Sequence, residues 1–143
     1  MKTYKQFISE QKQQRTAERA TRLVDRIHKK SGISYSDDIK NLLPNHKISA
    51  TVGLNLNYKD FEERGTITDV PMHKLYSDQR AVNSEVLKKK IRGDWKHHDP
   101  DIPYVVHHVP TDTYHLYDGN HRANQTKLLR HAVLKASVIK CDL

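Results

Sequence analysis

The residues best suited to chemistry in this sequence are five in a row, Asp-Gly-Asn-His-Arg at positions 118–122. They follow an alternating apolar stretch and precede a helix-like run over 123–131. A strand, a glycine turn and a helix start expose backbone N–H groups to an anion. Arg122 adds a planar cation and His121 a group that titrates near neutral pH. The spacing therefore predicts a phosphate-binding turn made of Gly119, Asn120, His121 and Arg122.

A hydrolytic or phosphoryl-transfer site at this turn would also need a base or nucleophile and usually a divalent metal. Asp118, His121 and Arg122 are the catalytic candidates, and His108 and Asp118 are the candidates to ligate Mg²⁺ or Mn²⁺. His107 and His108 are adjacent on a predicted strand, so only one of them can enter a given pocket. Two plainer interpretations stay open, because an Asp before Gly commonly shapes a turn and a helix-start His can face solvent. A loop cluster, His97-His98-Asp99, is either a further metal site or a polar surface.

The elements that must position the turn follow from hydrophobic periodicity. Strands are predicted over 66–70, 104–109, 113–117 and 136–140, and helices over 84–91, capped by Ser84, and 123–131. Pro110 to Asp112 makes the two middle strands a hairpin. The order β-α-β-β-α-β predicts an α+β fold with a small mixed sheet and packed helices. Upstream, short helices are expected over 39–43, between a Ser36-Asp37-Asp38 cap and Pro44, and over 58–64.

The first 35 residues concentrate positive charge, with nine Lys/Arg against three Asp/Glu. Ala20, Leu23, Val24 and Ile27 form a helical apolar stripe. The other face of this predicted basic helix carries Arg15, Arg19, Arg22 and Arg26. A second cluster, Lys88, Lys89 and Lys90, lies close before Trp95. Both clusters are candidates for nucleic-acid contact. The alternatives are a solvated charged face for the first helix and, for the second cluster, a solvated helix end whose charges favour the C-terminal dipole.

The bulk composition narrows the class of partner. The chain has 143 residues, a formal charge of +8 and a pI near 9.6, which favours an anionic partner. A single cysteine, Cys141, excludes an intramolecular disulfide and a cysteine-based zinc site. No apolar run approaches the roughly 18 residues of a membrane span, and no secretory signal is visible.

Residues 66–143 resemble the ParB/sulfiredoxin-like superfamily, often labelled ParB-like nuclease domains. The resemblance rests on an ordered set of short pieces: Ile67-Thr68-Asp69-Val70, Leu75, Gln79-Arg80, Arg92-Gly93, Ile102 to Val106, Tyr117 to Arg122, and 133–139. Members include CTP-hydrolysing partition proteins, sulfiredoxins, a kinase of free serine and proteins reported as nucleases. The resemblance implies that Gly119 to Arg122 bind nucleotide phosphates and that Gln79 and Arg80 face the same pocket.

Two departures from this superfamily limit the reaction. A sulfiredoxin has a cysteine where Asn120 stands, so the sulfinic-acid reduction would lack its nucleophile. A partition protein has an acidic residue there, followed by a helix-turn-helix region, and this sequence ends at Leu143. The resemblance therefore predicts a nucleotide or phosphate pocket without fixing a reaction.

The opening residues carry a second resemblance. Met1-Lys2-Thr3-Tyr4, Phe7-Ile8 and Glu10 resemble the capsid-targeting peptide of internal head proteins in T-even-type tailed phages. Such peptides direct small basic proteins into the prohead and are removed after a Leu/Ile-x-Glu signal, which Ile8-Ser9-Glu10 matches. An ordinary amphipathic helix start is the alternative.

Three hypotheses follow. The first is an internal head protein that is packaged in the virion, ejected with DNA and active on nucleic acid or nucleotide in the host cytoplasm. It divides the chain into a cleaved peptide (1–10), a basic helical region (11–65) and a ParB-like domain (66–143). The second is a free-standing, metal-dependent nuclease or nucleotide hydrolase. The third is a non-catalytic module that binds DNA or protein.

Overall fold

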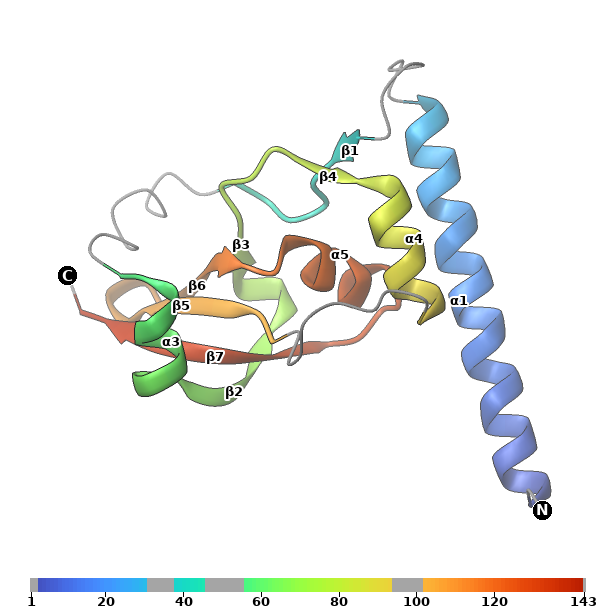
Figure 1. Ribbon diagram of the computed structural model, residues 1–143, viewed down its shortest axis with the longest axis horizontal. Helices are drawn as coiled ribbons and strands as arrows, with labels where there is room; N and C mark the ends of the chain where they lie inside the picture. Colours follow the sequence, from blue (N-terminus) through green and yellow to red (C-terminus); the bar gives the residue numbers. More distant parts are fainter. Residues whose placement is uncertain (1–2, 31–37, 46–55, 94–101, 143) are drawn as a thin grey trace.

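The computed structural model describes residues 3–30, 38–45, 56–93 and 102–142 and shows an α+β fold, as predicted. Its centre is a mixed five-stranded sheet in the order β2-β7-β5-β6-β3 (Figure 1). The strands are β2 (Thr66–Pro71), β3 (Leu75–Tyr76), β5 (Tyr104–His108), β6 (Thr113–Asp118) and β7 (Val133–Cys141). A separate two-stranded sheet pairs β1 (Asp38–Lys40) with β4 (Ala81–Asn83).

The sheet is mixed because its connections differ in length. The short turn between β5 and β6 makes these strands an antiparallel hairpin, as predicted, with His108 opposite Thr113 and Tyr104 opposite Asp118. The longer path through α5 (Asn120–Leu128) brings β7 back parallel to β5. The helix therefore begins at the end of β6, where the predicted anion-binding turn lies.

Two apolar layers cover the two faces of the sheet. On one face, Val105, Leu116 and Ala136 pack with Ala123 of α5. On the other, Phe61 of α3 (Tyr58–Arg64) packs on Val106. The predicted helix over 58–64 is confirmed, and its Asn57 and Asp60 cap one another in a capping box.

The first helix, α1 (Tyr4–Lys30), packs against α4 (Ser84–Arg92) through its second half. Ala20 and Val24 are fully buried there with Leu87 and Ile91, as the apolar stripe predicted. The N-terminal turns run beyond the body of the protein (Figure 1). Neither α1 nor any other helix of the described ranges combines the length and apolarity that a membrane crossing requires.

Three local predictions were wrong. Residues 39–43 are not helical, because Ile39, Asn41 and Leu43 alternate inward from β1 and the segment that follows it. The cap of α4 is Asn83, whose side chain accepts a hydrogen bond from the Val86 N–H. The helix expected over 123–131 begins at Asn120 and ends at Leu128.

Candidate anion-binding site

The predicted turn is fixed by Gly119. This residue has φ +103° and precedes the first residue of α5, and a Cβ there would come within 2.7 Å of the Pro103 side chain. Only glycine fits this backbone and this space. The Asp118 carboxylate accepts a hydrogen bond from the Gly119 N–H at 2.8 Å, so Asp118 shapes the turn. The turn therefore presents the first backbone N–H groups of α5, as expected of an anion site.

The Asn120 side chain points into the protein. Its Oδ1 accepts hydrogen bonds from Asn41 Nδ2, at 3.0 Å, and from the Ser77 hydroxyl. Its Nδ2 donates to Gln79 Oε1 at 3.1 Å. The structure thus brings Gln79 to the turn, as the resemblance implied, and commits Asn120 to internal contacts.

Asn41 is the centre of this network, and sequence reasoning missed it. Its Oδ1 accepts from the Leu43 N–H, at 2.9 Å, and from Asn124 Nδ2, at 3.0 Å. Its Nδ2 also donates to the Gln79 carbonyl at 2.9 Å. One buried amide therefore joins segment 41–45, segment 77–80 and α5. The sequence gives little sign of this role, because Asn41 is a polar residue at a position that the structure buries between Ile39 and Leu43.

A pocket of about 700 Å³ lies beside this network. Three cations line it, and each comes from a different part of the fold: Lys40 from β1, Arg80 from the segment before β4, and Lys127 from α5. Of the described residues in the lining, none is acidic. We call it the Arg80 pocket; the rest of its lining is Asn41, Leu42, Leu43, Pro44, Asn45, Ser77 and Gln79.

Residues His121 and Arg122 lie away from the Arg80 pocket. His121 Nε2 accepts a hydrogen bond from the Asn83 N–H at 3.0 Å, which fixes the start of α4. Arg122 Nη1 contacts Gln125 Oε1 at 3.4 Å, and Gln125 in turn donates to the Lys90 carbonyl. Of the predicted phosphate ligands, Gln79 and Arg80 line the pocket, and residues 119–122 are not among its described lining.

Asp118 also acts on an aromatic cluster made of Tyr58 and Phe61 from α3 with Tyr104 and Tyr117 from the sheet. Its charge is the largest of the effects that raise the pKa of Tyr58, and it adds to the rise in the pKa of Tyr104, which comes first from burial. Tyr58 lies 5.8 Å from Tyr104 between ring centroids. A carboxylate beside these rings disfavours the negative phenolate.

The two predicted metal ligands lie far apart. His108 and Asp118 end opposite strands of the β5–β6 hairpin, roughly 13 Å apart along the pairing. In the described ranges, no group of three or more His, Cys, Asp or Glu residues is placed to hold a metal ion. The loop cluster at 97–99 and Trp95 lie outside the described residues.

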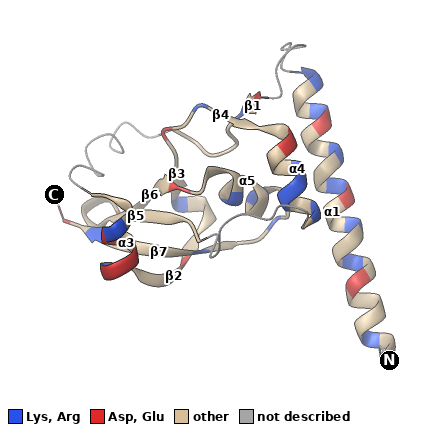
Figure 2. Ribbon diagram, in the orientation of Figure 1, with Lys and Arg blue, Asp and Glu red and all other residues tan. Residues whose placement is uncertain are grey.

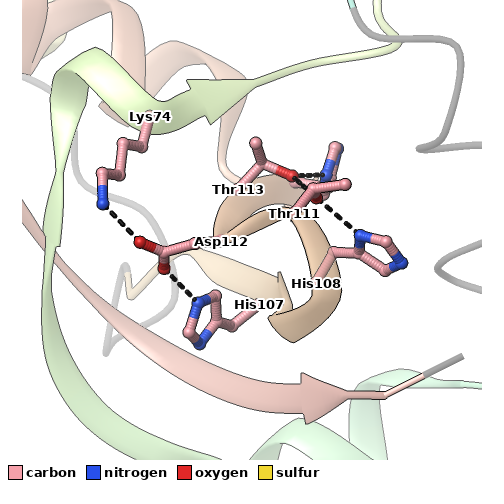
Figure 3. Close-up of polar contacts among 7 residues, drawn as sticks. Lys74, His107, His108, Thr111, Asp112 and Thr113 are labelled. Carbon is pink, nitrogen blue, oxygen red and sulfur yellow. Dashed lines mark hydrogen bonds and ion pairs between the residues drawn. The ribbon is translucent and has the colours of Figure 1, made fainter.

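The hairpin turn carries a second polar cluster (Figure 3). Asp112 has φ +50°, and its carboxylate contacts Lys74 Nζ at 2.5 Å and His107 Nε2 at 2.9 Å. The hydrogen bond from Lys74, followed by that from His107, lowers the pKa of Asp112. His107 also stacks on Tyr114, with ring centroids 4.2 Å apart.

On the other side of the turn, hydrogen bonds join two buried histidines through two hydroxyls. The chain runs from His108 Nδ1 to Thr111 Oγ1 (2.6 Å), then to Thr113 Oγ1 (2.7 Å), then to His115 Nε2 (2.8 Å). Three links need three hydrogens, and the two hydroxyls supply two. At least one of the two facing ring nitrogens must therefore carry a proton.

The predicted nucleic-acid-binding residues divide into free and engaged cations. Arg15, Arg22 and Arg26 are exposed on α1, and Lys89 is exposed on α4. Figure 2 shows Lys and Arg positions along the length of α1, interspersed with Asp and Glu. Arg19 donates to the Leu128 carbonyl at 3.2 Å and so satisfies the end of α5. Lys88, only 15% exposed, bridges Asp25 and Glu85 at 2.9 Å each. Arg19 and Lys88 therefore hold helices together.

Comparison with known proteins gives no family for this chain. No protein-family model matches the sequence, and no curated protein matches it. What the Arg80 pocket does is therefore inferred from the chain's own residues.

Proposed function

We propose that this protein binds the phosphates of a nucleotide or nucleic acid in the Arg80 pocket. The observation that carries the proposal is the meeting of Lys40, Arg80 and Lys127 in one pocket without a carboxylate among its described lining residues. Cations grouped without opposing charge attract a phosphate strongly. The volume of about 700 Å³ is in the range of small-molecule sites.

The resemblance of residues 66–143 to the ParB/sulfiredoxin-like superfamily supports this assignment in part. It implied one phosphate pocket formed by Gly119 to Arg122 together with Gln79 and Arg80. Gln79 and Arg80 line the Arg80 pocket, whereas residues 119–122 are outside its described lining. Exposed arginines on α1 would add sequence-independent contacts to a nucleic-acid backbone. A Mg²⁺ or Mn²⁺ ion would arrive with the phosphates rather than in a protein cage.

The proposed function is binding without hydrolysis, because the candidate catalytic groups already make structural hydrogen bonds. His121 Nε2 already accepts the Asn83 N–H, and Asp118 already accepts the Gly119 N–H. A nuclease or nucleotide hydrolase is the competing hypothesis. Hydrolysis of DNA or NTP with Mg²⁺ or Mn²⁺ by wild type, lost in Arg122→Ala, would establish it.

Binding is tested by calorimetry and by anisotropy of a labelled oligonucleotide. Lys40→Ala and Arg80→Ala should each weaken binding roughly five- to ten-fold and lower the salt dependence by about one charge. Lys135→Ala, an exposed lysine of β7 outside the pocket lining, is the matched control. Equal affinities for all four proteins would refute the pocket assignment.

We propose further that the protein travels inside a phage head. The support is the resemblance of residues 1–10 to capsid-targeting peptides, together with an exposed Glu10 at the expected processing position. Mass spectrometry of purified virions should find a form that begins at Gln11. Finding only the uncut chain, outside virions, would overturn this part.

A further inference from the structure

We infer that the Arg80 pocket recognises the polyphosphate part of its ligand and does not select the base. The inference rests on the proposed function and specifies the ligand class: nucleoside triphosphates of any base, or an equivalent run of phosphates. Three features of the pocket carry it.

The first feature is that the described lining offers no aromatic ring on which a base could stack. Bases are usually held between aromatic or planar groups and read at their edges. Of the described residues that line the Arg80 pocket, none is aromatic. Its apolar part consists of Leu42, Leu43 and Pro44. These side chains can contact a base but cannot fix its orientation by hydrogen bonds.

The second feature is the commitment of the lining amides. Gln79 uses Nε2 on the Ala81 carbonyl, at 2.7 Å, and Oε1 on Asn120. Asn41 is buried with both amide atoms engaged, and the Ser77 hydroxyl donates to Asn120. Reading a base edge through Asn41 would break these bonds, and the two bonds of Gln79 hold its amide in one orientation. Asn45, exposed at the rim, is the remaining amide of the lining.

The third feature is a preformed backbone frame that carries the three cations. Lys127 Nζ donates to the Leu42 carbonyl at 2.7 Å. The Asn41 N–H donates to the Arg80 carbonyl at 2.9 Å, and the Ser77 N–H to the Pro44 carbonyl at 3.0 Å. These bonds fix the walls before a ligand enters, so little ordering cost opposes binding. Lys127 is held by its side chain, and Lys40 and Arg80 extend from this fixed backbone as exposed cations. Three positive charges on one frame match a ligand that carries several phosphates.

The experiment is a calorimetric series on the full chain at low salt. The ligands are ATP, GTP, CTP, UTP, inorganic tripolyphosphate, ADP, AMP and adenosine, with homopolymeric single-stranded DNAs as a separate arm. We expect the four triphosphates and tripolyphosphate to agree within five-fold. Affinity should fall roughly five-fold per phosphate removed. Lys40→Ala should weaken all triphosphates by the same factor.

The outcomes separate the two proposals. A preference of more than five-fold for one base would overturn base independence and leave phosphate binding intact, and its loss in Asn45→Ala would identify the reader. If neither triphosphates nor the DNA strands bind, the proposed function itself falls. Binding of DNA strands without binding of triphosphates or tripolyphosphate would show that the nucleic-acid backbone is the ligand and would overturn the polyphosphate class.

Discussion

The two ends of the β5–β6 hairpin hold polar clusters of different kinds. At the end where β6 meets α5, neutral amides of Asn41, Asn120 and Gln79 join one another in fixed directions. At the turn between the strands, imidazoles, hydroxyls and one carboxylate form bonds whose hydrogens can change sides. Amide networks keep one arrangement at every ordinary pH, whereas imidazole networks change with protonation.

This difference indicates which end suits a binding pocket. The Arg80 pocket rests on the amide network, so its walls should keep their shape as pH and salt vary. The histidine-rich turn draws attention in the sequence, yet its side chains mainly bond to one another.

The largest expected effect comes from the glycine at the amide end. Gly119→Ala should lower the free energy of unfolding by roughly 2–4 kcal/mol, because φ is +103° and the new Cβ meets Pro103 at 2.7 Å. Gly93→Ala is the control, since Gly93 has φ +76° with nothing within 4 Å of a Cβ. It should cost about 1 kcal/mol. Equal losses in urea unfolding would show that the contact with Pro103 is unimportant.

The buried hub of the amide network should come next. Asn41→Ala should cost about 3 kcal/mol, because the Leu43 N–H loses its bond to the side chain and the buried Asn124 and Asn120 amides each lose one of their partners. It should also weaken triphosphate binding, since segment 41–45 forms one wall of the pocket. A loss of under 1 kcal/mol, with unchanged binding, would contradict the view that Asn41 organises the site.

A smaller effect is expected at the hairpin turn. Thr113→Val removes two of the three links of the histidine chain and should cost about 1 kcal/mol. In wild type, ¹⁵N chemical shifts should place a proton on at least one of His108 Nδ1 and His115 Nε2. In Thr113→Val the shifts of the His115 ring should change, because Nε2 loses its contact with the Thr113 hydroxyl. Unchanged shifts in the variant would show that this hydroxyl does not hold the ring.

The smallest effect concerns the exposed carboxylate of the same turn. Lys74 and His107 lower the pKa of Asp112, so its stabilising contribution should be present above about pH 4 and be lost as pH falls through the lowered value. Urea unfolding of wild type and Asp112→Asn should therefore differ at pH 6 and converge in acid. Asp142→Asn, an exposed position, is the control. A difference that persists below pH 2 would rule out the charge as its cause.

Strong periodicity made most of the fold predictable, and long-range pairing explains what was missed. Strands β2, β5, β6 and β7 and helices α1, α3 and α4 lie where alternation or a helical stripe placed them. The short strands β1, β3 and β4 have two or three residues each, too few to show a period. β1 forms only because β4 pairs with it across more than 40 residues of sequence.

The site was predictable in part for the same reason. The turn at Gly119 could be predicted because a glycine between an alternating strand and a helix commonly forms a tight turn. The Arg80 pocket needed Lys40, Arg80 and Lys127 to come together, and nothing local marks Lys40 or Lys127 as partners. The sequence also does not show which cations bind other parts of the protein. Arg19 and Lys88 are the same residue types as the exposed cations beside them, and only their contacts in the structure distinguish them.

The first helix is buried along only part of its length. Its buried residues, Ala20 and Val24, lie in the second half, while Tyr4 is 81% exposed. A helix rises 1.5 Å per residue, so Thr3 lies roughly 30 Å along the axis from Val24. A fluorophore or surface tether attached at Thr3 would therefore stand clear of the core, and the protein could be immobilised for single-molecule measurements without loading its sheet.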